Sequence, residues 1–416
     1  MKLGLIGYPL GHSWSPEIHA FFLGEENYSL FPIQDQDLPG FFKTTDLDGF
    51  NVTIPHKQAV IPFLDALDPV AEKIGAVNTV VHRDKRFIGY NTDWEGLTGM
   101  IRSHQIDLCG RHAAILGSGG ASKAAKAAVE ELGGTCDVVS RHAGPDAISY
   151  DALYEKEAAY SVLINATPVG MSPNEDAVPA DLSRFSHVEA VIDIVANPLR
   201  TSFLFEAKRR GMITCGGFEM LVRQALAADR YFTRRDMDEK MVGPCMNHLL
   251  KERRSIVLIG MPTCGKSTIA AKIHELTGRP LVEMDEEIEK RLGMTIRECF
   301  RTKGEAYFRS LETALAKELT RGNAVISCGG GIIKNPENMK YLSRNGQVFW
   351  INRDPRLLFG SPERPLSQSR EDILRLYEER RDLYALYSDI EIANNRTAMD
   401  AVHEILSITG DEGIAV

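Results

Sequence analysis

Nine residues in the second half of the chain, GMPTCGKST at positions 260–268, have the spacing of a phosphate-binding loop. They follow the apolar run SIVLI and precede a helical pattern, which is the context in which this motif binds nucleotides. Backbone N–H groups would surround the phosphates, Lys266 would reach the β and γ oxygens, and Ser267 would bind Mg²⁺. The motif predicts a nucleoside triphosphate site, which a GTPase, a transporter ATPase or a small-molecule kinase could use. The guanine-reading motif Asn-Lys-x-Asp and a transporter signature are absent.

A second glycine loop, LGSGGA at positions 116–121, lies between a predicted strand and an alanine-rich helix from about Ala121 to Leu132. This arrangement places a pyrophosphate on the N–H groups at the helix start. NAD sites carry an acidic residue about 20 residues further on, but here the next strand ends in Ser140, Arg141 and His142. Arg141 suits a ribose 2′-phosphate, so the pattern favours NADP. A purely structural turn and an ordinary surface arginine are the alternatives.

Candidates for proton transfer are Lys57, which follows a predicted strand, and Asp93 in the segment GYNTDWEG. A lysine that transfers protons needs a nearby carboxylate or partial burial, because its free pKa of about 10.4 is too high at neutral pH. Ser13 and Ser15 in GHSWSP are two hydroxyl donors suited to a small anion such as a carboxylate. Taken singly, Ser15 could instead cap a helix before Pro16, and Asp93 could be a helix N-cap.

Acidic and cationic residues also follow the phosphate-binding loop. Glu283 and Asp285 are predicted at a strand end, two residues apart and on one side of the strand. Arg309 and Glu312 are three residues apart, on one face of a predicted helix. Further candidates are Gly329, Gly330, Gly331, Arg364 and Arg380. Together they would hold an anionic, hydroxylated acceptor beside the γ-phosphate, although solvated arginines and a helix-start role for the two acids are the simpler explanations.

The elements that must position these residues come in two series. Short apolar runs alternate with helical patterns from residue 3 to about residue 195, which predicts parallel sheets with crossover helices. The alternation restarts at SIVLIG and continues through VFWIN. The charged segment 234–254 between them has no strand signal, so we place the main boundary near residue 248. For 416 residues, roughly three folding units are expected.

The composition excludes several classes of protein. The net charge is −9 without a long basic block, so nucleic acid is not an expected partner. The seven cysteines are scattered and never form a C-x-x-C pair, which argues for reduced thiols without structural zinc. Glycines and a proline break the N-terminal apolar run too early for a signal peptide, and no stretch approaches about 18 apolar residues. We expect a cytoplasmic protein without a membrane partner.

Residues 1 to about 240 resemble shikimate dehydrogenases through seven motifs in family order: GHSWSPEIH, NVTIPHK, GAVNTV, NTDWEG, ILGSGGASKA, INATPVGM and GFEMLVRQA. The resemblance implies that the nicotinamide delivers hydride to a ring carbonyl carbon while Lys57 protonates the developing alkoxide and Asp93 orients the lysine. The implied substrate contacts are Ser13, Ser15, Thr53, Asn78 and Gln224. The implied NADP contacts are Gly117, Ser118, Gly119, Gly120, Ala121, Ser140, Arg141, Thr167, Met171 and Gly217.

Three positions depart from the pattern of this family. Ser140 and His142 flank Arg141 where the family usually has Asn-Arg-Thr. Ala196 stands where the family often has a tyrosine near the substrate and nicotinamide, and Trp94 replaces a usual glycine. We expect weaker turnover or a shifted choice of substrate, for example towards quinate.

Residues from about 254 to 410 resemble shikimate kinases through the phosphate-binding loop, LVEMDEEIE, GEAYFRSLE, SCGGGII and the two later arginine segments. The resemblance implies that Asp285 receives the acceptor hydroxyl proton, and that Glu283, where aspartate is usual, helps hold Mg²⁺ through water. The implied acceptor contacts are Asp285, Arg309, Gly329, Gly330, Gly331 and Arg380. The implied ATP contacts are Gly260, Pro262, Thr263, Cys264, Gly265, Lys266, Ser267, Thr268 and the lid residue Arg364.

Together the resemblances predict a bifunctional α/β enzyme of aromatic amino acid biosynthesis, which reduces 3-dehydroshikimate with NADPH and phosphorylates shikimate with ATP and Mg²⁺. The predicted parts are a substrate α/β domain at 1–100 with a return helix at about 217–240, a Rossmann-type NADP domain at 101–216, a linker at 241–253 and a P-loop kinase domain with a parallel sheet at 254–416. One alternative is a quinate-type dehydrogenase fused to another small-molecule kinase. Another is a ligand-sensing regulator, against which the presence of Lys57, Asp93, Lys266 and Asp285 argues. The oligomeric state is left open.

Overall fold

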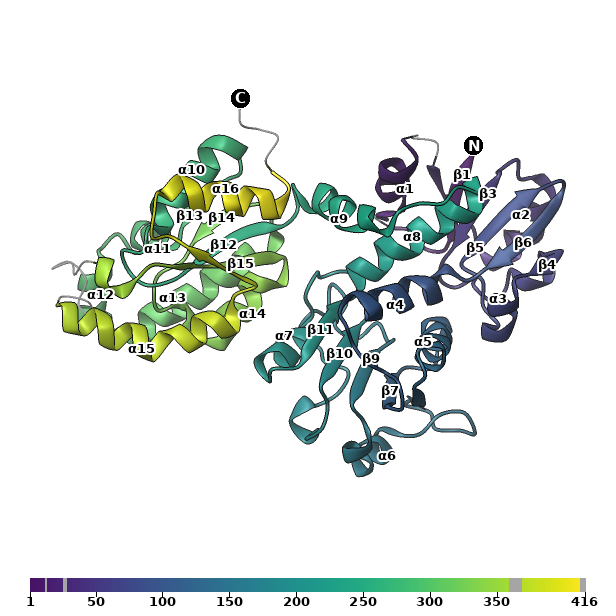
Figure 1. Cartoon of the computed structure of the whole chain (residues 1–416), viewed down its shortest axis with the longest axis horizontal. Helices are drawn as coiled ribbons and strands as arrows, with labels where there is room; N and C mark the ends of the chain where they lie inside the picture. The colour runs from purple at the N-terminus through teal and green to yellow at the C-terminus, as the bar shows by residue number, and fades with distance from the viewer. Residues whose placement is uncertain (12, 25–27, 359–368, 412–416) are drawn as a thin grey trace. The chain divides into compact units, whose positions relative to one another are not determined.

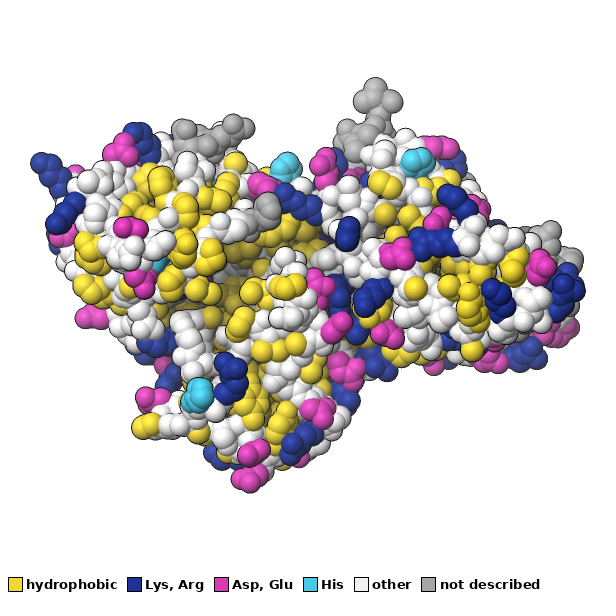
Figure 2. All heavy atoms as spheres, turned by 180° about the vertical axis from the view of Figure 1, so that it is seen from behind, with side chains coloured by type: hydrophobic (Ala, Val, Ile, Leu, Met, Phe, Trp, Pro, Cys, Tyr) yellow, Lys and Arg dark blue, Asp and Glu magenta, His cyan; other side chains and the backbone are white. Residues whose placement is uncertain are grey.

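The computed structural model describes residues 1–11, 13–24, 28–358 and 369–411, which divide into two units, Met1–Met246 and Asn247–Val416 (Figure 1). Helix α9 (Val242–Leu250) spans this division, inside the segment expected to be a linker. Among the described residues, no helix combines the length and the apolar character that crossing a membrane requires. Basic and acidic side chains are interspersed on the face drawn in Figure 2.

The first sheet of unit 1 has six strands in the order β2-β1-β3-β5-β6-β4. Their bounds are Leu3–Gly7 (β1), Tyr28–Pro32 (β2), Gly49–Val52 (β3), Ala66–Leu67 (β4), Thr79–Arg83 (β5) and Arg86–Tyr90 (β6). β1 is parallel to β2 and β3, but β5 is antiparallel to both β3 and β6, so the expectation of parallel sheets is wrong here. β5 and β6 are joined by a tight hairpin at Asp84 and Lys85, whose φ angles are 51° and 60°. Positive φ at both turn residues matches the twist of paired strands.

The second sheet of unit 1 is parallel throughout, with the order β11-β10-β9-β7-β8. Its strands are His112–Leu116 (β7), Thr135–Val139 (β8), Val162–Asn165 (β9), Ala190–Asp193 (β10) and Ile213–Gly216 (β11), and its helices are Gly120–Glu131 (α5), Tyr150–Glu155 (α6) and Ser202–Arg209 (α7). Ile115 and Ile164 pack into the core on one face, whereas Leu116 and Leu163, each one position away, pack into the core on the other. This alternation buries both faces of the sheet.

Two helices, α4 (Thr92–Ser103) and α8 (Gly217–Thr233), lie side by side between the two sheets of unit 1 (Figure 1). A Cβ atom at Gly96 would lie 2.8 Å from the Met220 carbonyl oxygen, so the absence of a side chain allows the helices to approach closely. The remaining helices of this unit are Ser15–Leu23 (α1), Leu38–Thr44 (α2) and Pro69–Ile74 (α3).

Unit 2 contains a five-stranded parallel sheet in the order β13-β14-β12-β15-β16. Its strands are Ser255–Ile259 (β12), Leu281–Glu283 (β13), Val325–Ser327 (β14), Gly346–Asn352 (β15) and Ile390–Ala393 (β16). Its helices are Lys266–Thr277 (α10), Met284–Leu292 (α11), Ile296–Lys303 (α12), Glu305–Glu318 (α13), Pro336–Arg344 (α14), Arg370–Tyr387 (α15) and Ala398–Thr409 (α16). The predicted fold class, with a Rossmann-type sheet followed by a P-loop domain with a parallel sheet, is confirmed.

Candidate active sites

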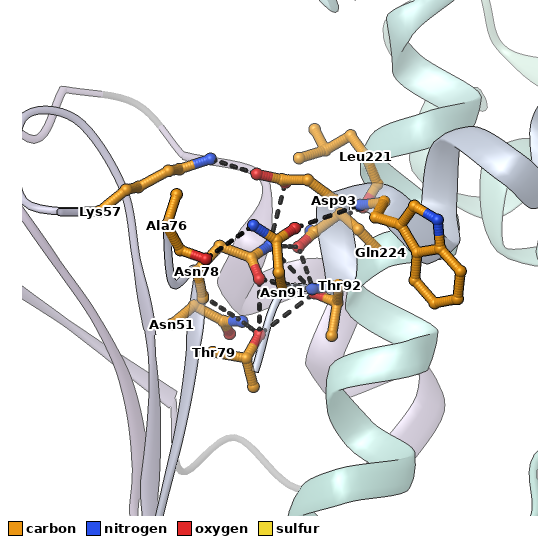
Figure 3. Close-up of polar contacts among 11 residues, drawn as sticks. Asn51, Lys57, Ala76, Asn78, Thr79, Asn91, Thr92, Asp93, Leu221 and Gln224 are labelled. Atoms are coloured by element: carbon orange, nitrogen blue, oxygen red, sulfur yellow. Dashed lines mark hydrogen bonds and ion pairs between the residues drawn. The ribbon is translucent and has the colours of Figure 1, made fainter. Parts of the chain in front are cut away.

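Lys57 and Asp93 meet in unit 1, where Lys57 Nζ donates a hydrogen bond to Asp93 Oδ2 at 2.5 Å (Figure 3). Lys57 follows β3, and Asp93 lies in the first turn of α4, where the helix dipole favours negative charge. Asp93 is not the N-cap, because Asn91 fills that position and accepts a hydrogen bond from Trp94 N at 3.3 Å. The Lys57 and Asp93 side chains are 21% and 11% exposed, so a substrate can reach the pair.

Asn78 holds the second oxygen of Asp93 in the same network (Figure 3). Its Nδ2 donates to Asp93 Oδ1 at 2.9 Å and to Gln224 Oε1 at 3.3 Å. Its Oδ1 accepts a hydrogen bond from Thr92 N at 2.6 Å. Gln224 comes from α8, where its Nε2 donates to Leu221 O at 2.9 Å. Four of the predicted site residues therefore belong to one hydrogen-bonded network.

Ser13, Ser15 and Thr53 lie near the ends of the neighbouring parallel strands β1 and β3. The Thr53 side chain packs on β1, since a Cβ at Gly7 would be 2.4 Å from Thr53 Cγ2. Ser13 Oγ accepts a hydrogen bond from Ser15 N at 3.2 Å, and Trp14 rather than Ser15 is the N-cap of α1. Among the described residues, the three hydroxyls make no hydrogen bond to the network of Figure 3. The structure therefore places these residues at the same edge of the sheet but does not join them to that network.

The glycine loop after β7 leads into α5 with the geometry of a dinucleotide site. Gly117 has a φ of 109°, which glycine adopts readily, and a Cβ there would lie 2.9 Å from the Thr167 side chain. Gly119 is the N-cap of α5, and nothing lies within 4 Å of the position that its Cβ would occupy. The N-terminus of α5 is therefore open to a pyrophosphate group.

The same loop adjoins both Arg141 and the Lys57–Asp93 pair. Ser118 Oγ lies 3.3 Å from Ser140 Oγ, which places the exposed Arg141 beside the glycine loop. A Cβ at Gly120 would lie 3.9 Å from Lys57 Cδ. The lysine thus borders the start of the helix that would hold the dinucleotide, and these residues fit NADP.

The other residues assigned to the cofactor side lie near this sheet edge. Ala121 is the second residue of α5, and Met171 is 47% exposed in the loop after β9. Gly217 begins α8, where a Cβ would lie 2.0 Å from Ile194 O, so close backbone packing requires glycine.

Of the departures from the family pattern, Trp94 packs beside the apolar cluster of Ile74, Ala76 and Ala127, and Ala196 lies partly buried in the loop after β10.

In unit 2 the phosphate-binding loop joins β12 to α10. Gly260, Thr263 and Gly265 have φ angles of 147°, 63° and 102°, and backbone of this kind in a turn can form a concave site for an anion. Lys266 Nζ donates to Gly260 O at 3.0 Å and to Met261 O at 2.9 Å, so the lysine lies across the loop. A cavity of about 230 Å³ adjoins it, lined by residues that include Thr263, Ser267, Thr268 and Asp285. Pro262 and Cys264 complete the loop, whereas Arg364 lies outside the described residues.

Glu283 and Ser267 fit a magnesium site beside this cavity. Ser267 Oγ donates to Glu283 Oε2 at 3.1 Å. Glu283 Oε1 is buried and has no hydrogen-bond partner among the described residues. Burial raises the pKa of Glu283, and hydrogen bonds from Ser327 and Ser267 lower it. A hydroxyl next to a carboxylate with a spare oxygen is a typical ligand set for Mg²⁺.

Asp285 lines both the cavity of about 230 Å³ beside the phosphate-binding loop, here called the phosphate cavity, and a second cavity of about 580 Å³. It lies in the first turn of α11 and not on the strand, so its expected place beside Glu283 on one strand face is wrong, because β13 ends at Glu283. A Cβ at Gly329 would lie 2.5 Å from Asp285 Oδ1, and one at Gly331 would lie 2.8 Å from the Arg309 guanidinium. The glycines therefore leave the room that these two side chains occupy.

Arg309 and Arg380 both line the larger cavity. Arg309 Nη1 donates to Glu312 Oε2 at 2.7 Å. Burial raises the pKa of Glu312 to about 7, and the Arg309 charge lowers it. Arg380 Nη1 and Tyr384 Oη donate to Gly330 O at 2.9 Å and 2.7 Å. Tyr384 was not predicted, although it follows Arg380 by four residues on α15 and so shares its helix face.

Comparisons with known protein families match both units. The model of the shikimate dehydrogenase substrate binding domain matches residues 5–80, and the model of the shikimate kinase family matches residues 262–409. The chain is 36% identical over 272 residues to a shikimate dehydrogenase (NADP(+)) of Shouchella clausii, covering 60% of this chain and 98% of that protein. It is 38% identical over 260 residues to the enzyme of the same name from Moorella thermoacetica, covering 56% of this chain and 88% of that protein.

Solved structures give the same result for unit 1. Shikimate dehydrogenase 1 from Peptoclostridium difficile matches with 35% identity and a TM-score of 0.55, covering 60% of this chain and 98% of that one. Shikimate 5-dehydrogenase from Thermus thermophilus in complex with NADP(H) and shikimate matches with 31% identity and a TM-score of 0.54, covering 60% and 99%. A chorismate mutase/shikimate 5-dehydrogenase fusion protein from Clostridium acetobutylicum matches with 32% identity and a TM-score of 0.56, covering 60% and 97%. The resemblances drawn from the motifs are confirmed.

Proposed function

Because this chain belongs to the shikimate dehydrogenase family and carries a shikimate kinase domain at residues 262–409, we propose that it catalyses two consecutive reactions of aromatic amino acid biosynthesis. The first is the NADPH-dependent reduction of 3-dehydroshikimate to shikimate. The second is the ATP-dependent phosphorylation of shikimate to shikimate 3-phosphate. The observation that carries the proposal is that one chain matches both families, because the shikimate made by the first proposed reaction is the acceptor of the second.

Lys57 is the proton donor of the dehydrogenase site in this proposal. NADPH supplies the hydride, and the carbonyl oxygen that becomes an alkoxide needs a proton at the same time. Asp93 holds the Lys57 ammonium at 2.5 Å, and Asn78 fixes the other Asp93 oxygen at 2.9 Å, so the donor has a defined position. We assign the substrate carboxylate and hydroxyls to Ser13, Ser15, Thr53, Asn78 and Gln224.

Arg141 is expected to select NADPH over NADH, since the exposed guanidinium beside the glycine loop suits a ribose 2′-phosphate. In Arg141→Asp the KM for NADPH should rise about 10- to 100-fold, the usual value of a hydrogen-bonded charge pair. The KM for NADH should change little. Steady-state kinetics with both cofactors measure the effect, and Arg209→Asp, a charge reversal on α7, is the control. Equal use of NADPH and NADH by the unmutated protein would contradict the assignment.

Asp285 is the proton acceptor of the kinase site, because it lies where the phosphate cavity meets the larger cavity. Arg309 and Arg380 line the larger cavity and supply positive charge for the acceptor carboxylate. Gly329, Gly330 and Gly331 leave the floor between them free of side chains. Lys266 lies at the loop that surrounds the phosphates and stabilises the charge on the transferred group.

Glu283 is expected to set the magnesium requirement of the kinase, because its Oε2 accepts from Ser267 and its Oε1 has no hydrogen-bond partner among the described residues. Glu283→Gln keeps the size of the side chain but removes its charge. The Mg²⁺ concentration for half-maximal phosphorylation should rise by about 10- to 100-fold, the usual effect of altering groups around a metal. Titrating Mg²⁺ at saturating ATP gives this value. Glu287→Gln, on the following helix α11 and paired with Arg291, is the matched control and should behave like the unmutated protein.

A coupled assay on the full-length protein tests both activities together. With 3-dehydroshikimate, NADPH, ATP and Mg²⁺, mass spectrometry should detect shikimate 3-phosphate, and without ATP it should detect shikimate only. Quinate and nucleoside acceptors in parallel reactions test the alternative of a different dehydrogenase and kinase. Ligand binding without turnover of any substrate would favour a regulator and contradict the proposal.

We also propose which segments of the chain carry each function. The substrate side of the dehydrogenase comprises residues 1–100 with the return helix, the NADP side comprises residues 101–216, and residues 254–416 form the kinase. Small molecules are the proposed partners. The absence of nucleic-acid binding and the cytoplasmic location stay predictions from the sequence.

A further inference from the structure

Two loops leave the adjacent strands β9 and β10 at the same edge of the parallel sheet. β9 ends at Asn165 and β10 ends at Asp193, and these two residues are paired in the sheet register. The first loop, residues 166–172, contains Thr167 and contacts the dinucleotide loop at Gly117. The second loop, residues 194–201, touches the start of α8, because a Cβ at Gly217 would lie 2.0 Å from Ile194 O. The two loops thus connect the glycine loop with the helix that carries part of the catalytic network.

Asn165 holds the first loop through three hydrogen bonds. Its Oδ1 accepts from Thr167 N at 3.0 Å and from Thr167 Oγ1 at 2.6 Å. Its Nδ2 donates to Val169 O at 3.2 Å and also to Asp193 Oδ1 at 2.8 Å. The backbone of the two loops is joined further by Ser172 N, which donates to Asn197 O at 3.1 Å.

Asp193 holds the second loop. Its Oδ1 accepts from Val195 N at 3.0 Å, and its Oδ2 accepts from Thr201 Oγ1 at 2.6 Å. Thr201 is also the N-cap of α7 and accepts from Leu204 N at 3.3 Å. The Asp193 carboxylate therefore holds both ends of the second loop, through Val195 and Thr201. It also holds the Asn165 amide, which in turn holds the first loop.

The burial of the Asp193 carboxylate costs free energy, because the charged group is removed from water. Asn165 and Asp193 are both 0% exposed, and no lysine, arginine or histidine among the described residues forms an ion pair with Asp193. Burial raises the pKa of Asp193 to about 6, and hydrogen bonds from Thr201, Val195 and Asn165 lower it. A buried carboxylate without a cation is expensive, and hydrogen bonds to a charged acceptor are about twice as strong as neutral ones. An apolar residue at the end of β10 would avoid this cost but would leave both loops unanchored.

We propose that Asp193 is a positioning residue of the dehydrogenase, which, through Asn165 and Thr201, holds loops 166–172 and 194–201 as one rigid platform for the bound dinucleotide. This inference rests on the proposed dehydrogenase function. Asp193 acts through the loops and does not touch the reacting atoms. Its loss should therefore affect the binding and placement of NADPH more than the binding of 3-dehydroshikimate.

The test is Asp193→Asn, which keeps the shape of the side chain but removes the charge and one acceptor oxygen. The KM for NADPH should rise at least tenfold, and kcat should fall about 10- to 100-fold, the usual cost of a reactant misplaced by about 1 Å. The KM for 3-dehydroshikimate should change less than twofold, and the kinase rate should not change. Asp181→Asn, which removes an exposed carboxylate that caps a short turn through Ser183 N, is the matched control and should have no effect.

A pH profile separates positioning from a purely structural role. In the unmutated protein the KM for NADPH should rise as the pH falls through about 6, because a protonated Asp193 loses an acceptor. The groups that face Asp193 are Asn165, Val195 N–H and Thr201, none of which titrates in this range. Relative to the unmutated protein, Asp193→Asn should lack this rise. An identical profile in both proteins, or an equal rise of KM for both substrates, would overturn the proposal.

A second pair of variants covers the case in which Asp193→Asn does not fold. Thr201→Val removes the hydroxyl that donates to Asp193, whereas Thr201→Ser retains it. Thr201→Val should weaken NADPH binding, measured by nicotinamide fluorescence, and Thr201→Ser should restore it; equal binding by the two variants would overturn the proposal. If the unmutated protein fails to reduce 3-dehydroshikimate, the proposed function fails. Full activity with an unaffected Asp193→Asn variant means that only the inference fails.

Discussion

Replacing Lys57 by alanine is expected to lower the turnover of 3-dehydroshikimate reduction by roughly 100- to 10,000-fold, the usual contribution of a general acid or base. The Lys57 ammonium lies 2.5 Å from Asp93 Oδ2 and borders the start of α5 through Gly120. Alanine offers no proton to the developing alkoxide. Phosphorylation of added shikimate should stay unchanged, because the groups proposed for that step lie in unit 2. NADPH oxidation and ATP-dependent phosphorylation, measured on one preparation, check both expectations.

Lys73→Ala is the control for this prediction. Lys73 also forms an ion pair, with its Nζ 2.9 Å from Glu130 Oε2, but its side chain is 67% exposed and lies outside the hydrogen-bonded network of Lys57 and Asp93. Its replacement should leave both activities intact. Circular dichroism shows whether each variant is folded. A folded Lys57→Ala protein that reduces 3-dehydroshikimate within tenfold of the unmutated rate would exclude Lys57 as the proton donor.

Local sequence signals account for the parts of the sites that depend on backbone conformation. Gly117 and Gly265 have φ angles of 109° and 102°, and glycine is the residue that adopts such angles without strain. A strand, a glycine turn and a helix in succession were therefore enough to place both nucleotide loops. Lys266 follows directly from its position one residue after Gly265. The Lys57–Asp93 pair joins residues 36 positions apart, so it came from the family resemblance and not from local pattern.

Contacts between segments that are far apart in the sequence leave no local sequence signal of this kind. Asn78 bonds to Gln224, 146 positions away, and which face of α8 meets which strand depends on the packing of the whole unit. Asp193 lies within the apolar run AVIDIV, so the run predicts a buried strand but not that the carboxylate at the end of β10 would be buried and hydrogen-bonded. The hairpin at Asp84 and Lys85 was missed because Lys85 stands where glycine usually follows the first turn residue.

Replacing Lys266 by alanine is expected to abolish the kinase activity, with a fall of at least about 100- to 1,000-fold, the cost of removing one group that stabilises a developing charge. Phosphoryl transfer depends mostly on positioning and electrostatics, so no other group in the loop replaces a missing ammonium. Lys266 is largely buried and donates to Gly260 O and Met261 O, both within the loop itself. Reduction of 3-dehydroshikimate by the same protein should continue at the unmutated rate.

Lys272→Ala is the control, since Lys272 lies six residues further along α10 and is not among the residues that line the two described cavities of unit 2. The decisive measurement is both activities in both lysine variants. Lys57→Ala should lose reduction alone, and Lys266→Ala should lose phosphorylation alone, because one lysine moves a proton and the other stabilises phosphoryl charge. In the coupled assay each variant should stop at a different compound: Lys57→Ala should leave 3-dehydroshikimate, and Lys266→Ala should accumulate shikimate. If either folded variant lost both activities, two independent sites would be the wrong description, and one reaction would have to depend on the other.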